Sequence, residues 1–443
     1  RLPAWGLTGG GGLSILGANP LYWLLHGNRE GSKMGRVLFA LSLVACTLLL
    51  NACGVGGPPQ PTPTKLEHDV DQVKLGVEDV RELSAKHDVP LRLVSTEELG
   101  EAHAKVLERY YSREEGLRES LELWLLRLIE DRSVDLYQLS KDLFTQGYVG
   151  FYVYDTKEMF VLSEGNELVA EPRAILAHEF AHALQDQHFD LAKLEPPDSD
   201  DYDRNLAISA LIEGDAQWTT GLYVQSYMPS GDLLKLKYAA VPVPPDDSPR
   251  FPYYLGELGS FPYEWGEAFV GEVLKRDLYK FEAVNKVFAA PPSSTEQIMH
   301  PEKYLDTRDD PLPVTVPPLT NTLGTGWTYE HGASIGEFSL QRLLAYHYSN
   351  DPEGEAAGWG GGRYDLYTKG EDALLITVTR WDTSEDAVEF HEALLVTFLD
   401  YEHEGDIYDD GLGRFFTAGL DGDTVTFTAS TDRAALERIA GGR

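Results

Sequence analysis

Cysteine is nearly absent from this chain. Its 443 residues include 2 cysteines, Cys46 and Cys53, and both lie in one apolar stretch near the N-terminus. If this stretch is removed on export, no pair of cysteines is left to form an internal disulfide, so stability must come from a hydrophobic core. The chain after residue 64 is long enough to build such a core.

Basic residues are also scarce. Lys and Arg number 37 against 72 Asp and Glu, which gives a formal net charge of −35. This balance repels nucleic acid and anionic membrane surfaces, so neither is expected as a partner. After the N-terminal stretch, no apolar run reaches the ~20 residues that a membrane-spanning helix needs.

The N-terminal stretch has the features of a lipoprotein signal peptide, predicted over residues 34–53. A basic start at Met34-Gly-Arg is followed by an apolar run and then by Leu50-Asn-Ala-Cys53. We predict that Cys53 becomes the lipidated first residue of the mature chain. Cleavage before Cys46 is the alternative, but it would leave a shorter apolar segment. The expected product is an extracytoplasmic lipoprotein held at the cell membrane by its lipid anchor alone.

Two short segments flank the signal peptide. Residues 1–33 are rich in glycine and show no periodicity, so we expect Met34 to be the true start and residues 1–33 to form no fold. Residues 54–64 are rich in Pro and Gly, and this composition is typical of a tether between a lipid and a folded body.

The clearest chemical signal is the run His178-Glu-Phe-Ala-His182. In a helix, residues four apart lie on one face about one turn apart, so both imidazoles could bind one Zn²⁺ ion. Glu179 could then act as a base toward water at the metal without being a ligand. Its apolar flanks predict a buried helix, in which an unpartnered Glu179 would be costly. The alternative is a core helix with two hydrogen-bonded histidines.

Two residues compete for the place of third zinc ligand. Glu213 lies in a second apolar helical run, and a glutamate from a downstream helix closes His₂Glu zinc sites. His188 has the spacing of metzincin sites, but Gln185 stands where that pattern needs a helix-breaking glycine. We favour Glu213 and expect Asp215 to orient a ligand histidine from outside the ligand set.

Four segments resemble gluzincin-type zinc metallopeptidases found among bacterial exported lipoproteins. The resemblance covers most of the chain after residue 64 and rests on residues 178–191, 211–216, 291–304 and 357–364. It implies a zincin fold, a bound Zn²⁺ ion and metal-dependent hydrolysis, without naming a substrate.

The expected fold class is α+β. Residues 148–154 and 158–162 predict a β-hairpin just before the first histidine helix, which is the order of a zincin. We therefore expect residues 65–355 to form a mainly helical, zincin-like catalytic domain with a small sheet. Residues 356–443 show a β-β-α-β-α pattern, which indicates a small antiparallel α+β unit. The glycine-rich run around Trp359 is expected to form a packed turn.

These features favour a zinc-dependent peptidase that acts on a peptide or protein substrate. His300 or Tyr304 could stabilise the oxyanion of a tetrahedral intermediate, although a structural turn would explain both residues equally well. Two alternatives stay open: a catalytically idle zincin fold used as a surface binding module, and an amidase for cell-wall peptides. The sequence indicates no oligomeric state.

Overall fold

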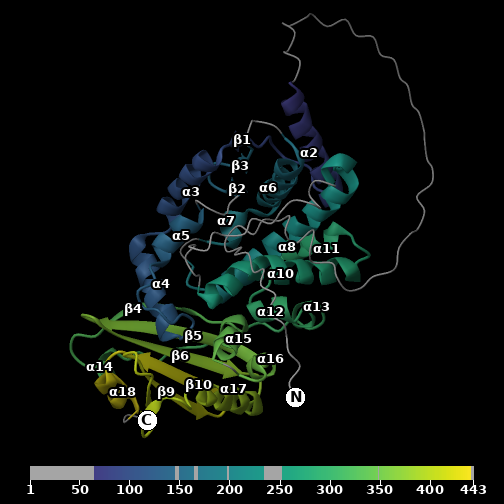
Figure 1. The fold of residues 1–443 in the computed structure, drawn as a ribbon. Helices are drawn as coiled ribbons and strands as arrows, with labels where there is room; N and C mark the ends of the chain where they lie inside the picture. The colour runs from purple at the N-terminus through teal and green to yellow at the C-terminus, as the bar shows by residue number, and fades with distance from the viewer. Residues whose placement is uncertain are drawn as a thin grey trace, which may run out of the picture.

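The computed structural model of the chain describes residues 64–144, 149–163, 168–196, 199–233, 252–347 and 349–440. It is a mixed α+β structure in which a helical body carries a small sheet and joins a larger antiparallel sheet (Figure 1). The α+β fold class is thus confirmed. Within the described ranges, no helix has the length and apolar character needed to cross a membrane.

Helices make up most of the first three quarters of the described chain. They are α2 (Lys65–Arg81), α3 (Thr96–Tyr110), α4 (Arg113–Leu125), α5 (Leu136–Phe144), α6 (Ala170–Phe189), α7 (Leu191–Leu194), α8 (Tyr202–Tyr227), α10 (Tyr253–Arg276), α11 (Phe281–Ala289), α12 (Thr295–Met299), α13 (Glu302–Leu305), α14 (Thr320–Leu323), α15 (Glu337–Tyr346) and α16 (Pro352–Ala356). Local sequence sets several starts: α2, α3 and α4 each begin with a capping box, in which an N-cap hydroxyl and a glutamate three residues later satisfy free backbone N–H groups.

The small sheet lies beside α6. Its strands are β1 (Leu91–Val94), β2 (Gly150–Val153) and β3 (Glu158–Leu162), in the order β1-β3-β2. β2 and β3 pair antiparallel, which confirms the predicted hairpin, and β1 runs parallel to β3. Met159 and Val161 of β3 are fully buried against Ile175 of α6, in a core that also includes Val77 of α2.

The large sheet has seven strands in the order β4-β5-β6-β10-β9-β8-β7. They are β4 (Thr328–Ser334), β5 (Trp359–Lys369), β6 (Asp372–Trp381), β7 (Glu402–Glu404), β8 (Ile407–Asp409), β9 (Phe415–Asp421) and β10 (Thr424–Ser430), with helices α17 (Ser384–Val396) and α18 (Arg433–Ala440). Side chains alternate between its two faces. Leu375 joins the core that contains α15 and α17, whereas Leu374 and Ile376 pack with α18.

This sheet differs from the predicted C-terminal unit. Its first strand, β4, lies upstream of residue 356, and its core continues into the helical body, with Ile208 and Phe269 in the same cluster as Phe427. The sequence pattern also missed β7, β8 and β9. β7 and β8 have three residues each, which is too short for a readable periodicity. The predicted turn at residues 360–362 is wrong, since these glycines lie within β5.

The glycines of β5 have a packing role. A Cβ on Gly361 would lie 2.5 Å from the carbonyl oxygen of Leu312, and one on Gly362 would lie 2.4 Å from that of Ile335. The chain around Leu312 also donates a backbone hydrogen bond to the carbonyl of Gly360. Glycine therefore lets other backbone segments lie directly on the strand.

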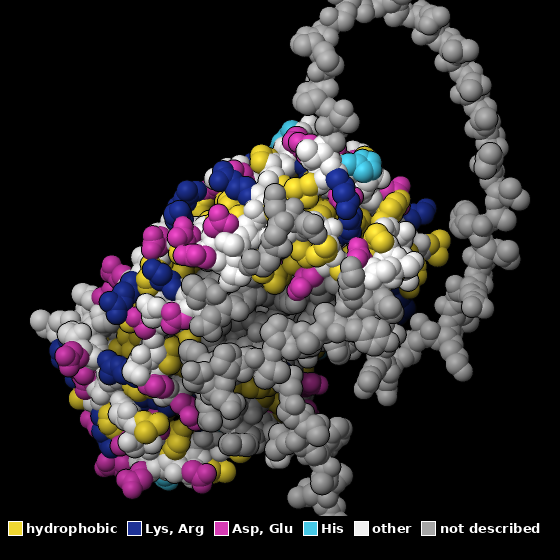
Figure 2. Space-filling model, turned by 45° about the horizontal axis from the view of Figure 1, so that its top comes forward, with side chains coloured by type: hydrophobic (Ala, Val, Ile, Leu, Met, Phe, Trp, Pro, Cys, Tyr) yellow, Lys and Arg dark blue, Asp and Glu magenta, His cyan; other side chains and the backbone are white. Residues whose placement is uncertain are grey.

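Charges of both signs are spread over the surface. On the face shown in Figure 2, Asp and Glu side chains are interspersed with Lys and Arg. Many form pairs such as Arg92–Glu158 and Arg109–Asp155, both exposed. Such exposed pairs contribute little to stability, so the fold depends mainly on its apolar cores.

The α8–α10 contact gives a stability test. A Cβ on Gly266 would lie 2.0 Å from the carbonyl oxygen of Ala210, so Gly266→Ala must push the helices apart. Overpacking of this kind costs about 1–3 kcal/mol. Gly231→Ala is the matched control, because Gly231 is exposed and a Cβ there meets nothing within 4 Å. Denaturant unfolding should show a lower free energy of unfolding for Gly266→Ala only. Equal stability of the two variants would contradict this packing.

Candidate metal centre

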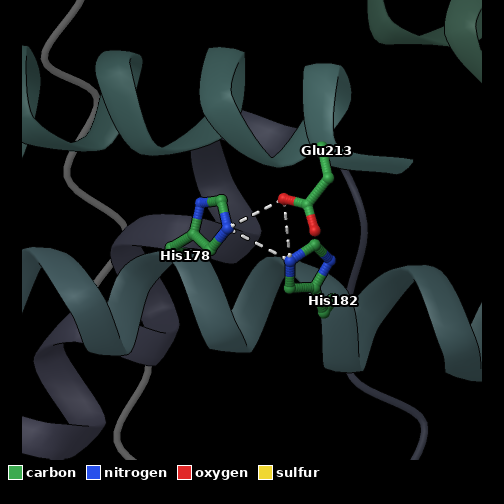
Figure 3. A group of neighbouring side chains, drawn as sticks. All are labelled: His178, His182 and Glu213. Atoms are coloured by element: carbon green, nitrogen blue, oxygen red, sulfur yellow. Dashed lines mark hydrogen bonds and ion pairs between the residues drawn. The ribbon is translucent and has the colours of Figure 1, made fainter. Parts of the chain in front are cut away.

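Helices α6 and α8 bring together His178, His182 and Glu213 (Figure 3). The residues of α6 from Ala174 to Asp186 are all buried, as expected for a helix that is apolar on most of its faces. The two histidines lie one turn apart on α6, and both imidazoles point toward the carboxylate from α8. The sequence therefore predicted both the elements and the three residues that meet.

Distances within this group match the edges of a metal coordination tetrahedron. Nε2 of His178 lies 3.1 Å from Nε2 of His182 and 3.2 Å from Oε2 of Glu213. The third edge, from His182 Nε2 to Glu213 Oε2, is 3.5 Å. Metal–ligand bonds of about 2.0–2.1 Å in tetrahedral geometry place ligand atoms about 3.3 Å apart. The three residues therefore fit a single Zn²⁺ ion.

The hydrogen bonds at Nδ1 of the two imidazoles also agree with metal binding through Nε2. Nδ1 of His182 lies 2.9 Å from Oε1 of Gln185, an oxygen that can only accept. Nδ1 of His178 lies 3.4 Å from Oγ1 of Thr220, whose own hydrogen goes to the carbonyl of Ala216. Both rings can thus donate from Nδ1 and turn the Nε2 lone pairs inward, as metal-binding histidines do.

The electrostatics of the group also favour a cation. Burial works against charge on every member, and it lowers the pKa of His178. For His182, burial is outweighed by the Glu213 carboxylate, which raises the pKa of His182 to about 9. The pKa of Glu213 is held well below its usual range by the two histidines, against the effect of burial. The same pocket that holds a proton between these groups could hold a metal ion.

Glu179 is buried beside the ligand group and belongs to the contact with β2. Its exposed fraction is 6%, and burial raises the pKa of its carboxyl to about 8, with a backbone hydrogen bond from Tyr152 acting in the opposite direction. Gly150 of β2 leaves room for it, since a Cβ there would lie 3.3 Å from Cγ of Glu179. The carboxyl therefore sits between the helix and the sheet.

Asp215, the residue predicted to orient a ligand histidine, is connected to His182 through Gln185. The Gln185 amide donates to Oδ2 of Asp215 over 2.8 Å and to the carbonyl of Ile212 over 2.9 Å. Its oxygen is left to face His182. Gln185 thus has a role that sequence reasoning missed, because it had been considered only as a helix former.

A hydrogen bond and an ion pair of Asp186 hold α6 against the small sheet. Asp186 lies one turn after His182 and accepts a hydrogen bond of 2.7 Å from the hydroxyl of Tyr152. Lys157, in the turn between β2 and β3, lies 2.6 Å from the same carboxylate. The β2–β3 hairpin is therefore fixed against the helix that carries the histidines.

His188 lies outside the group. Its Nε2 is 2.8 Å from the carbonyl oxygen of Ser84, so it does not point toward His178 and His182. The helix continues through Gln185 to Phe189, which is why the ring does not return to their face. The geometry thus agrees with the choice of Glu213 over His188.

His300 and Tyr304 also lie away from the group, and the structure gives both a structural role. His300 pairs with Glu337 at 3.0 Å, and the Tyr304 hydroxyl donates to the carbonyl of Ala290. Their segment reaches α8 through Thr295, which bonds Asp203; this end of α8 is about 15 Å of helix from Glu213. The oxyanion role suggested for either residue is therefore not supported by position.

Tyr154 and Glu195 lie near the ligand group and were missed by the sequence reasoning. Glu195 accepts a hydrogen bond from Ser209, which precedes Glu213 by one turn of α8. Burial raises the pKa of Glu195 to about 7. Burial also raises the pKa of Tyr154 far above its usual range, with the carboxylates of Glu195 and Glu213 adding to the effect. Neither residue stands in a recognisable motif.

A second acidic group surrounds a lysine. Glu296, Asp309 and Asp382 have carboxylate oxygens close enough to share an ion. Lys303 lies among them, at 2.5 Å from Glu296, 3.2 Å from Asp309 and 3.1 Å from Asp382. This group is a salt-bridge network.

The predicted lipidation residue, Cys53, lies outside the described residues.

Comparison with known proteins adds little to the assignment of this centre. A family described as a domain of unknown function, DUF8575, matches residues 327–440, which hold the large sheet and its helices but neither α6 nor α8. No curated protein and no solved structure matches the chain. The chain is thus similar to this family over its C-terminal part.

Proposed function

We propose that the protein is a zinc-dependent peptidase with a zincin-like core, anchored outside the cytoplasm by a lipid on Cys53. One observation carries the proposal: two histidines and a glutamate from two packed helices place three ligand atoms at the spacings of one tetrahedral metal site. The order of sheet, histidine helix and glutamate helix adds support for the core.

Each residue of the centre has a distinct part. His178, His182 and Glu213 would hold the metal, and the bound ion would supply a Lewis acid that polarises a carbonyl and acidifies water. Glu179 would accept a proton from water and pass it to the leaving amine. Its burial at the contact with β2 keeps this carboxyl in one place.

Two other functions would use the same fold. A catalytically idle binding module needs no base, so the presence of Glu179 beside the ligands favours the enzyme. An amidase for cell-wall peptides would use the same residues on a different peptide. The substrate is therefore proposed as a peptide or protein.

Metal binding is the first test. His178→Ala and His182→Ala should each abolish stoichiometric zinc, because two remaining ligands cannot close the site. Glu213→Ala should weaken zinc binding by more than the ~10–100-fold typical of residues outside the ligand set. His188→Ala is the matched control on the same helix and should leave affinity unchanged. Elemental analysis would measure the zinc content, and competition with a chelating dye would measure the zinc affinity. Stoichiometric zinc in the two histidine variants would contradict the site.

Catalysis by Glu179 is tested by Glu179→Gln. The amide keeps the size and much of the hydrogen bonding of the carboxyl but cannot take up the proton, so turnover should fall about 10²–10⁴-fold. Zinc content and unfolding midpoint should match those of the wild type. A peptide library read by mass spectrometry gives the activity. Cleavage at the wild-type rate would rule out this base, and a zinc-loaded wild type that cleaves nothing would favour the binding module.

Anchoring is tested by substitution of the two cysteines. Cys53→Ser should release the protein from the membrane fraction and abolish labelling by a fatty-acid probe, since no other lipid attachment is proposed. Cys46→Ser is the control and should leave both unchanged. Release of the Cys46→Ser variant would show that Cys46 is the lipidated residue. Retention of both variants in the membrane fraction would argue against a lipid anchor.

A further inference from the structure

Arg81 is fully buried at the last position of α2, far in sequence from the metal centre, and it forms an ion pair with Asp215. We propose that Arg81 is a positioning residue for the metal centre: it holds Asp215 in place, and Asp215 and the Ile212 carbonyl together orient the Gln185 side chain against His182. The inference rests on the proposed metal site.

A continuous chain of contacts connects the two ends. Nε of Arg81 lies 2.8 Å from Oδ1 and 3.0 Å from Oδ2 of Asp215. Asp215 Oδ2 accepts from the Gln185 amide nitrogen, and the Gln185 oxygen lies 2.9 Å from Nδ1 of His182. Each contact has a donor on one side and an acceptor on the other. The Gln185 amide nitrogen also donates to the carbonyl of Ile212, so Asp215 and this carbonyl together set the direction of the amide.

The chain of contacts ends at Arg81 in a buried ion pair. Arg81 and Asp215 are both 0% exposed, and a buried carboxylate without a counter-charge is strongly unfavourable. The ion pair with Arg81 holds the Asp215 side chain where it accepts from the Gln185 amide nitrogen. Gln185 thus presents its NH₂ group to Asp215 and to the Ile212 carbonyl, and its oxygen to His182.

The orientation of Gln185 decides which nitrogen of His182 is free. With the amide oxygen against Nδ1, the ring must carry a proton on Nδ1 and can offer its Nε2 lone pair to a metal. If the amide were reversed, its NH₂ group would face Nδ1. In a neutral ring, the proton would then be on Nε2, which faces His178 and Glu213, and that tautomer cannot bind a metal there.

Arg81 also ties other helices to this chain. Its Nη2 lies 2.8 Å from Oδ1 of Asn285 on α11, and its guanidinium stacks over the ring of Phe281 at 4.7 Å. The placement of α2 and α11 thus supports the end of the chain. Arg127 offers a matched control, because it is 1% exposed, bonds Thr397, and has no contact with the metal centre among the described residues.

The experiment measures zinc affinity of the full chain by competition with a chelating dye, for the wild type, Arg81→Met and Arg127→Met. Arg81→Met should weaken zinc binding about 10–100-fold, the range for residues that orient a ligand. Arg127→Met should lower the unfolding midpoint and leave zinc affinity unchanged. Equal affinity of Arg81→Met and wild type would overturn the inference while leaving the proposed function intact. A wild type without zinc would overturn both.

A double-mutant cycle with Asp215→Asn separates positioning from a general loss of structure. The Asp215→Asn variant removes the buried negative charge, so adding Arg81→Met to it should cost no further zinc affinity, and this double variant stays foldable if Arg81→Met alone does not. Additive losses in the cycle would show that Arg81 acts independently of Asp215 and would contradict the proposal.

Discussion

The packing of α6 against α8 is the constraint on which the candidate site depends. It places two imidazoles and one carboxylate within 3.1–3.5 Å of one another in a buried region. Three such groups crowd their lone pairs together, which is unfavourable unless a proton or a metal ion lies between them. The buried residues of α6 secure one side of this arrangement, and Gly214 and Gly266 let α10 pack closely against the other side of α8.

Around this centre, the two ligand histidines are each supported at Nδ1 by a different helix. Thr220 of α8 supports His178, and Gln185 of α6 supports His182. Asp186 fixes the β2–β3 hairpin to α6, so the strand that borders Glu179 moves with the histidines. The large sheet contributes to the common core but supplies none of these groups among the described residues.

Sequence alone identified the parts of this site that follow from helical periodicity. The spacing of His178 and His182 fixes one face of a helix, and Gln185 argued correctly against a return of His188. Contacts between distant segments could not be predicted in this way: Arg81 has no local signal, and the motif around His300 looks the same whether it serves catalysis or packing. The C-terminal strands β7, β8 and β9 were missed, and β7 and β8 are too short to show a pattern.

Zinc-edge anomalous diffraction from crystals of the zinc-loaded protein tests the central claim most directly. The account predicts one strong peak about 2.0–2.2 Å from Nε2 of His178, Nε2 of His182 and a carboxylate oxygen of Glu213. A zinc-loaded crystal with no peak between these three residues, or with its peak at another group such as His300 and Glu337, would contradict it.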